Sequence, residues 1–574
     1  MVAVKILEIF GMNNENVKKA EPIEATNFIE HEINKDILAG KIHGGIQTRH
    51  PPEPSGYLHI GHVRNIVMNY GTAKKYGGVC NLRYDDTNPL KEKQEYVDAL
   101  QEDVQWLGYK WGNIYHATDY FEQNYEIAVK LIKEGKAYVC DLSPEELSAT
   151  RGTLTEPGQN SPYRNRSVEE NLDLFERMKN GEFEQGSRCL RAKIDMASPN
   201  INMRDPVIYR IQYLEHQRIG RQWNIYPSYD FSHPLDDCLE GVTHSICGLE
   251  FEDHRPLYNW VVENSGLENK SRQIEYSNLL IKNTVSGKRN IKKLVEEGIV
   301  WGWDDPRLIT IRGLRRRGIL PQSLIDFVVA AGLSKTTTIC EKDMLDYFVR
   351  NTLNEKARRV MAVLDPIKLV ITNYVGEGEE ILLEDYPQKG EETTKRTYTF
   401  GKELWIERSD FEVTPPPKYH RLYVGNKVRL KGAYVITCTG YDLNEDGSVK
   451  CVYAEYDKDT KSGSGVEVKV KGTIHWLNAD YARKVEVRKF DNLIAEGEGS
   501  TSERAEIGEV VYNKDSVHIN KNAYVESGVN YTLEDRYQFM RNGYYALDSV
   551  DSKTEALVFN EVVGLKGSYK PETK

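Results

Sequence analysis

The chain has 574 residues, enough for about three to five domains of ordinary size and too many for one hydrophobic core. Hydrophobic residues make up 39% and charged residues 28%, which excludes a wholly disordered chain, and no run of about 18 apolar residues indicates a membrane-spanning helix. The formal net charge of −11 excludes a basic coat over the whole protein, although local basic surfaces for nucleic acid stay compatible with it.

The N-terminus and the cysteines indicate the compartment. Residues 1–24 have the character of a poorly tied extension, and charges interrupt the apolar stretch that a signal peptide would need. Eight cysteines are scattered without a C-x-x-C pair, which excludes a disulfide scaffold or an obvious zinc knuckle. We therefore expect a cytoplasmic protein with no structural metal and no membrane association.

Strand-like and helix-like segments alternate from about residue 44 to 290, as in α/β domains. Residues 78–84 predict a strand, and 94–107 predict an amphipathic helix. From about 290 to 357 the pattern favours helices with basic clusters, among them the arginines within 312–317. After about residue 358, short alternating segments separated by turn residues predict β-barrels or sandwiches.

The most specific pattern in the chain is P-P-E-P-S-G-Y-L-H-I-G-H at residues 51–62. A helix that begins near Gly61 would present its N-terminal amides to an anion beside His59 and His62. Such donors suit a phosphate-bearing substrate on which charge develops in the transition state. Taken alone, two histidines at this spacing would also suit a metal ion or a polar surface turn.

This pattern resembles the HIGH signature of class I aminoacyl-tRNA synthetases, in the form shared by the glutaminyl and glutamyl branches. The second signature of that class, a mobile loop ending in a lysine, is matched by V-S-G-K-R at 285–289. The resemblance runs from about residue 25 to the C-terminus. Further segments look like the glutaminyl branch, namely 81–89, 151–158, 161–171, 244–255 and 303–307.

The resemblance implies a Rossmann-like α/β catalytic domain with an acceptor-stem insertion, a helical subdomain and two C-terminal β-barrels. The implied divisions are the extension at 1–24, the catalytic halves at 25–118 and 229–289, the insertion at 119–228, the helical subdomain at 290–357 and the anticodon-binding barrels at 358–574. Within the barrels, the distal one is expected at about 367–478 and the proximal one at about 479–574.

The implied activity is ATP-dependent ligation of L-glutamine to the 2′-hydroxyl of the terminal adenosine of tRNA(Gln), through a glutaminyl-adenylate. AMP and diphosphate would be released. ATP would enter with Mg²⁺ as a substrate complex, and the protein would work as a monomer. Two alternatives stay open: a glutamyl or dual-specificity enzyme, and a non-catalytic RNA-binding paralogue.

Within this resemblance His59, His62 and Lys288 are the catalytic residues, and Lys288 neutralises the pyrophosphate leaving group. The implied ATP site comprises Glu53, Pro54, Ser55, His59, Ile60, Gly61, His62, Gly248, Asn278, Leu279, Ser286, Gly287 and Lys288. Four of these depart from the family pattern, which often has a threonine at Gly248, an arginine at Asn278, an apolar residue at Ser286 and a serine at Gly287.

The implied glutamine pocket reads an amide rather than a carboxylate. Asp85 would hold the α-ammonium, the Tyr229 hydroxyl would meet the side-chain amide, and Gln273 would help to hold a bridging water. A neutral hydroxyl-and-water site accepts from NH₂, whereas a carboxylate substrate would leave those acceptors facing a negative charge. The remaining implied members are Arg49, Cys247 and His233.

Three of these positions have a plainer interpretation outside the resemblance. Asp85 could form an Asx-turn after a strand. Tyr229 could be a core ring with a satisfied hydroxyl, and Cys247 could be a small buried hydrophobe.

For RNA, the resemblance matches Leu154 to a leucine that opens the terminal base pair. Asp253 matches a carboxylate that reads guanine amino groups in the minor groove. Lys335 and the arginines within 312–317 would follow phosphates, unless those arginines form a solvated charged face. Arg359 and Arg421 match contacts to the anticodon loop, whose splayed bases are read by stacking and edge hydrogen bonds.

Overall fold

The computed structural model describes residues 19–53, 56–87, 94–285, 287–386, 394–494 and 512–571. The chain forms two compact units, one of Met1–Leu280 with Val328–Ile339 and one of Ile281–Phe327 with Cys340–Lys574. It passes from one unit to the other at β10 (Leu279–Ile281), α12 (Pro321–Ala330) and β11 (Thr338–Cys340).

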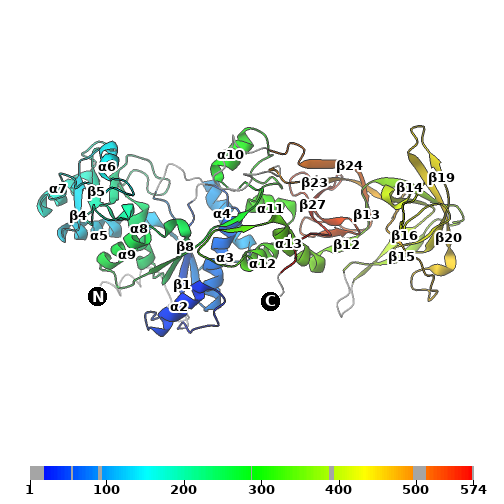
Figure 1. Ribbon diagram of the computed structural model, residues 1–574, viewed down its shortest axis with the longest axis horizontal. Coiled ribbons are helices and arrows are strands. Elements are labelled where there is room, and N and C mark those ends of the chain that lie inside the picture. Colours follow the sequence, from blue (N-terminus) through cyan, green and yellow to red (C-terminus); the bar gives the residue numbers. More distant parts are fainter. Residues whose placement is uncertain are drawn as a thin grey trace. The chain divides into compact units, whose positions relative to one another are not determined.

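A parallel sheet organises the first unit (Figure 1). Strands β1 (Gln47–His50), β2 (Val79–Tyr84) and β3 (Ile114–His116) pair in parallel, and so do β8 (His244–Gly248) and β9 (Arg272–Tyr276). The amide of Thr243 donates to the carbonyl of Gln47 at 2.9 Å, which places β8 beside β1. In open parallel sheets, ligands bind outside the carboxyl ends of the strands.

Helical crossovers connect these strands. Helix α3 (Ile60–Lys75) follows β1, and its buried Ile60, Val63 and Val67 recur at helical spacing because that face packs on the sheet. Helix α4 (Gln94–Trp106) follows β2. The strand predicted at 78–84 and the helix predicted at 94–107 are both confirmed. Helix α2 (Phe28–Leu38) precedes the sheet.

A second, antiparallel sheet lies in the chain between β3 and β8. Its strands pair in the order β4 (Ala137–Cys140), β5 (Cys189–Ala192), β6 (Val207–Ile211) and β7 (Ile225–Pro227). Helices α5 (Phe121–Lys133) and α7 (Val168–Lys179) share a hydrophobic core with this sheet, and α6 (Pro144–Thr150) follows β4. Helices α8 (Tyr229–Leu239) and α9 (Arg255–Ser265) then flank β8 in the sequence.

The second unit begins with helices and continues with strands. Its helices are α10 (Lys288–Glu296), α11 (Ile311–Arg317) and α13 (Lys342–Lys356). One seven-stranded sheet, the proximal sheet, has the order β12 (Arg358–Val360), β25 (Tyr537–Phe539), β26 (Gly543–Leu547), β27 (Val558–Gly564), β23 (Arg483–Phe490), β24 (Val517–Val525) and β13 (Ala362–Val363). The other, the distal sheet, has the order β21 (Thr473–Ile474), β18 (Lys427–Leu430), β19 (Val435–Leu443), β20 (Val449–Asp457), β14 (Pro366–Ile371), β17 (Glu403–Glu407) and β22 (Leu477–Asn478). A hairpin of β15 (Glu379–Glu384) and β16 (Lys395–Phe400) accompanies the distal sheet.

Both seven-stranded sheets close on themselves. Their edge strands are neighbours in the sequence: one residue separates β12 from β13, and two residues separate β21 from β22. The two edges of each sheet must therefore meet, which makes a barrel around its own apolar core. The β-rich architecture predicted after residue 358 is confirmed. The proximal barrel also takes in residues 358–363, which lie outside the bounds of about 479–574 expected for it.

None of the described helices combines the length and the apolar character that crossing a membrane requires.

Candidate functional site

The two histidines of the 51–62 pattern lie at the start of α3, where each orients the other. His59 is the N-cap, and its Nδ1 accepts from the amide of Gly61 at 3.0 Å. The amide of His59 donates in turn to Nδ1 of His62 at 3.1 Å. Because both Nδ1 atoms accept, the proton of each neutral ring lies on Nε2. Burial, with a smaller effect of His62, holds the pKa of His59 well below its usual value, so this ring is a neutral donor.

The backbone amides at the start of α3 donate to His59 and, contrary to the expectation, do not face an open anion site. Those of His62 and Val63 donate to the carbonyl of His59, at 2.8 and 3.2 Å, and that of Gly61 donates to the His59 ring. The expectation that these amides face an anion is therefore wrong for these three positions. The imidazole edges, rather than the amides, are the donors that this turn offers to a phosphate.

The other predicted ATP residues of the first unit lie at strand ends. Gly248 ends β8, Leu279 begins β10 in a buried position, and the carbonyl of Asn278 accepts from the amide of Thr338 at 3.0 Å. A Cβ at Gly248 would collide with the carboxylate of Glu250, which occupies the space of the missing side chain. Glu53 is exposed and Ile60 is buried, whereas Pro54 and Ser55 lie outside the described residues.

The lysine loop belongs to the second unit. Gly287 is the N-cap of α10, and Lys288 is the first residue of that helix. Ser286 lies outside the described residues. A turn follows β10, and Lys288 lies on the first turn of the helix that begins after it.

The predicted glutamine residues of the first unit gather around the start of α8. The ring of Tyr229 stacks on that of His233, one helical turn later, with centroids 4.9 Å apart and planes 16° apart. Phe251 packs on the same tyrosine at 5.4 Å. Burial raises the pKa of Tyr229 well above its usual value, with Arg49 opposing and Asp85 and Cys247 adding to the rise, so these groups share one neighbourhood. The Tyr229 hydroxyl makes no hydrogen bond within the described part of the chain.

The remaining residues assigned to the pocket lie on strands of the parallel sheet or directly after them. Asp85 follows β2 and accepts from the Thr87 hydroxyl at 2.8 Å, and burial raises the pKa of its carboxyl. On β9, the Gln273 amide donates to the carbonyl of Phe251 at 3.0 Å and to Glu275 at 2.8 Å. This leaves the Gln273 oxygen as an acceptor. Cys247 is buried on β8, and burial raises the pKa of its thiol, so it behaves as a small hydrophobe.

A buried ionic network that the sequence did not reveal supports this pocket. Asp237 on α8 pairs with Nε of Arg49 at 3.1 Å and with Nη2 of Arg83 at 2.7 Å. The His233 ring lies between the same two guanidinium groups, 2.7 Å from Arg49 and 3.0 Å from Arg83. Although burial opposes it, the guanidinium groups of Arg49 and Arg83 hold the pKa of Asp237 well below its usual range. Charged residues at buried positions of a strand and a helix were the only available signal for this network.

The predicted tRNA contacts of the first unit lie on its surface. Leu154, in the turn after α6, is 82% exposed. Asp253 is exposed, and its carbonyl accepts from the amides of Asn200 and Asn202, at 2.7 and 3.2 Å. Its carboxylate has no partner among the described residues. Lys335 is half exposed and pairs with Glu252 at 3.3 Å.

The predicted anticodon contacts lie at the barrels. Arg359 is on β12, and its Nη2 donates to the carbonyl of Asn354 at 2.9 Å. Arg421 pairs with the buried Asp410 at 2.8 Å, and Arg541 pairs with the same carboxylate at 2.6 Å. Both predicted contact residues are thus anchored within the second unit.

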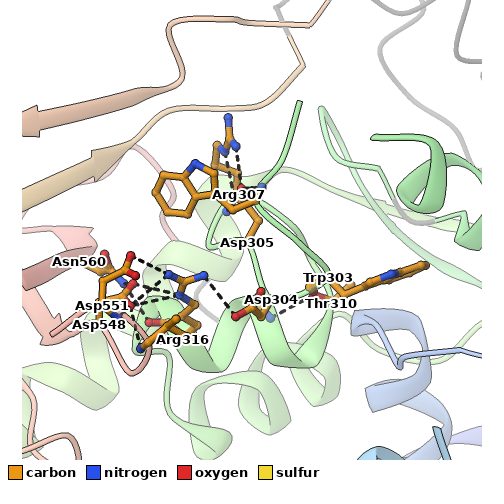
Figure 2. Close-up of polar contacts among 12 residues, drawn as sticks. Trp303, Asp304, Asp305, Arg307, Thr310, Arg316, Asp548, Asp551 and Asn560 are labelled. Carbon is orange, nitrogen blue, oxygen red and sulfur yellow. Dashed lines mark hydrogen bonds and ion pairs between the residues drawn. The ribbon is translucent and has the colours of Figure 1, made fainter. Parts of the chain in front are cut away.

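The arginines of α11 do not form a free basic surface. Figure 2 shows Arg316 among three aspartates, with Nε 3.0 Å from Asp548, Nη1 3.2 Å from Asp304 and Nη2 3.1 Å from Asp551. Arg317 is buried and donates to the carbonyl of Val562 at 3.1 Å. The prediction that this cluster follows phosphates is wrong for these two residues, and so is the alternative of a solvated face, because both hold α11 to the proximal barrel.

In the part of the chain that the structure describes, no group of three or more His, Cys, Asp or Glu side chains is arranged to hold a metal ion.

Comparison with known proteins identifies the family. The model for the catalytic domain of class I tRNA synthetases (E and Q) matches residues 45–355, and two models for anticodon-binding domains of the same class match 357–457 and 473–548. A glutamine–tRNA ligase of Clostridium perfringens is 52% identical over 548 residues, covering 95% of this chain and 99% of that protein. The chain belongs to the glutamine–tRNA ligase family of class I synthetases.

Other relatives agree along the whole length. A glutamine–tRNA ligase of Pseudomonas aeruginosa is 48% identical over 559 residues, covering 96% of this chain and 100% of that protein. Among solved structures, a glutamate–tRNA ligase from Elizabethkingia meningosepticum has 18% identity and a TM-score of 0.41, covering 54% of this chain and 69% of that chain. The family models establish a class I catalytic domain followed by two anticodon-binding domains, and the predicted fold class and glutaminyl family are confirmed.

Proposed function

We propose that this member of the glutamine–tRNA ligase family activates L-glutamine with the Mg²⁺ complex of ATP and transfers it to tRNA(Gln). In the first step, a glutamine carboxylate oxygen bonds to the α-phosphorus, and the bond to the bridging oxygen of diphosphate breaks. In the second step, the 2′-hydroxyl of the terminal adenosine attacks the acyl carbon, and AMP leaves.

The histidine pair acts on the phosphates without accepting a proton. The neutral His59 ring, with its proton on Nε2, donates toward charge that develops on the nucleotide in the transition state. His62 acts in the same way, with its tautomer set by the His59 amide. Lys288 neutralises the departing diphosphate, and no side chain becomes covalently attached to substrate.

The observation that carries the choice of glutamine is the Tyr229 hydroxyl, which belongs to a partly buried ring and has no partner among the described residues. The uncharged phenol and the Gln273 oxygen accept from the amide NH₂ of glutamine. Asp85 takes the α-ammonium. A glutamate carboxylate would place negative charge against these acceptors.

The proposed tRNA contacts include two exposed side chains of the first unit. Leu154 is an apolar side chain available to separate the terminal base pair, and the Asp253 carboxylate is available to accept from a guanine amino group. Lys335 lies on the same unit and contacts phosphate. Arg359 and Arg421, each anchored at a barrel, contact the anticodon loop.

The test is aminoacylation of purified tRNA(Gln) with labelled glutamine and, in parallel, labelled glutamate. We expect glutamine to be charged and glutamate to be charged at background level. Charging of both amino acids would establish a dual-specificity enzyme, and charging of glutamate alone a glutamyl enzyme. Tight tRNA binding without charging of either would establish a non-catalytic RNA-binding protein.

A further inference from the structure

Four charged side chains form a buried cluster that includes the two guanidinium groups in contact with the His233 ring. They are Arg49 of β1, Arg83 of β2, Asp237 of α8 and Glu240, the residue at which α8 ends, and we refer to them as the floor cluster. None of the four is more than 6% exposed. Asp237 bridges the two guanidinium groups, while Glu240 reaches only Arg83, at 3.1 Å.

Two titratable groups neighbour the floor cluster. Burial raises the pKa of Asp236 well above its usual value, and its carboxyl accepts from the Ser232 hydroxyl at 2.8 Å and the Asn124 amide at 3.1 Å. Burial also holds the pKa of His233 well below its usual value, so that ring is neutral. The cluster therefore carries two positive charges, and these are balanced only when Asp237 and Glu240 are both ionised.

Glu240 is the weakly held member of this balance. Both of its carboxylate oxygens are buried and lack a hydrogen-bond partner among the described residues, so its charge is supported by the ion pair with Arg83 and, to a smaller extent, by the guanidinium of Arg49. Asp237, by contrast, receives Arg49, Arg83 and the Tyr258 hydroxyl, the last at 2.8 Å. A buried carboxylate without hydrogen bonds is costly, so a functional reason for this one is expected.

The floor cluster connects Glu240 to the substrate pocket. Arg83 contacts both Glu240 and the His233 ring, and that ring stacks on Tyr229. Tyr229 and Glu240 lie at opposite ends of α8, whose 11 residues rise by about 1.5 Å each. The charge of Glu240 therefore affects the electrostatic potential around Tyr229 directly, and it also neutralises the guanidinium of Arg83 that contacts the His233 ring.

We propose that Glu240 is a specificity-determining residue, whose negative charge cancels the second guanidinium so that the floor of the glutamine pocket is neutral. The inference rests on the proposed function and deepens it. With Glu240 uncharged, the floor carries one net positive charge, and the carboxylate of glutamate is attracted where the amide of glutamine is not. Over a distance equal to the length of α8, and at the effective dielectric constant of a protein, one unit charge changes the ratio of glutamate to glutamine binding by about fivefold.

The same charge makes discrimination depend on pH. Burial raises the pKa of Glu240 to about 7, with Arg83 opposing and Asp237 adding to the rise. The charged and titratable groups that face Glu240 are Arg49 and Arg83 from the sheet, Tyr115 from β3, Tyr120 before α5, and Asp236 and Asp237 from α8. Burial raises the pKa of both tyrosines and of Asp236, and the arginines hold the pKa of Asp237 low against burial, whereas the pKa of Glu240 lies at about 7. Protonation at lower pH removes the negative charge and favours glutamate.

The experiment compares Glu240→Gln, which keeps the shape but removes the charge, with Glu240→Asp, which keeps the charge. Pyrophosphate exchange with tRNA present gives kcat/KM for glutamine and for glutamate, about one pH unit above and about one unit below 7. In the natural protein and in Glu240→Asp, the ratio of glutamate to glutamine should rise as the pH falls. In Glu240→Gln, the ratio should be raised about fivefold at the higher pH and should not change with pH.

The outcomes separate this inference from the proposed function. Glutamine activation with equal ratios and parallel pH profiles in all three proteins would overturn the role of Glu240 alone. Absence of glutamine activation by the natural protein would overturn the proposed function and this inference with it. A thermal melt accompanies each variant, and if Glu240→Gln does not fold, a flat pH profile of the natural protein still overturns the inference.

Discussion

Each unit of the protein buries guanidinium groups against aspartates, yet the two arrangements serve different ends. In the first unit, Asp237 pairs with Arg49 and Arg83 directly beneath a stack of aromatic rings. In the second, Arg316 meets three aspartates, and Asn560 donates to Asp548 at 2.7 Å (Figure 2). Both networks pair guanidinium groups with carboxylates, so they differ in the groups that surround these ion pairs.

The second network is closed in the sense that Arg316 and Asn560 meet on Asp548 and so join α11 to the proximal barrel. The first has an open side, where the Tyr229 hydroxyl has no partner within the described chain. Closed buried networks hold structural elements in one arrangement, whereas open ones orient groups that meet a ligand. Substitutions in the two networks should therefore separate stability from substrate recognition.

The largest effect is expected for Asp548→Ala. It leaves the buried Arg316 without its main partner, and we expect a loss of about 3–5 kcal/mol in the free energy of unfolding. The KM for glutamine of the folded protein should stay unchanged. Urea unfolding and pyrophosphate exchange at saturating tRNA measure the two quantities.

Asp237→Ala is the matched variant in the first unit. It should cost a similar free energy of unfolding, because two buried guanidinium groups lose their shared partner, but it should also raise the KM for glutamine. Equal changes in glutamine KM for the two variants would contradict the distinction between closed and open networks.

Lys288→Ala should lower the rate of adenylate formation by about 10²–10³-fold, the usual cost of losing one preorganised group that meets charge only in the transition state. The affinity for tRNA should not change. Pyrophosphate exchange and a tRNA binding curve are the two measurements. Parallel losses in both would show that Lys288 is an RNA contact or a structural residue.

Tyr229→Phe removes one hydroxyl and keeps the ring that stacks on His233. We expect a loss of about 1–3 kcal/mol in kcat/KM for glutamine and weaker discrimination against glutamate, because a buried polar group of the substrate loses its partner. Steady-state aminoacylation with both amino acids and a thermal melt test this. A lower melting temperature with proportionate loss for both amino acids would instead indicate a core tyrosine.

Leu154→Ala is expected to have the smallest effect. It should slow charging of a tRNA whose first base pair is intact by about 1–2 kcal/mol, a part of the few kcal/mol that unpairing costs, and should spare a tRNA with a mismatch there. The comparison of the two tRNAs is its own control. Equal loss with both would contradict the assignment of Leu154 as a wedge.

Local elements of the fold were predictable because their signals are local. The strand at β2 and the helix at α4 follow from apolar spacing within a few residues, and the start of α3 follows from the motif that contains His59. The pairing of β12 with β25 joins residues 358–360 to 537–539, and no local pattern specifies that register.

The residues of the candidate site likewise divide into those that a local motif predicts and those that only the folded chain brings together. Histidines and a lysine within short motifs could be named from the sequence, but the contact between Arg83 and Asp237 spans 154 residues and could not. The arginines of α11 show the converse: a run of basic residues looked like a nucleic-acid surface, although Arg316 and Arg317 are buried against partners more than 200 residues away. Charge in a sequence shows that a partner is needed, but not whether that partner is RNA or the protein itself.

The closure of the proximal barrel has a consequence for synthesis of the chain. Every strand of the distal barrel lies between β13 and β23, so the distal barrel is an insertion within the proximal one. Its last strand is translated by residue 478, while β12 and β13 have no partner until β24 and β25 emerge more than 150 residues after them. Because domains form as units while the chain is made, the inserted distal barrel is completed first, and β12 and β13 pair only after β24 and β25 have been synthesised.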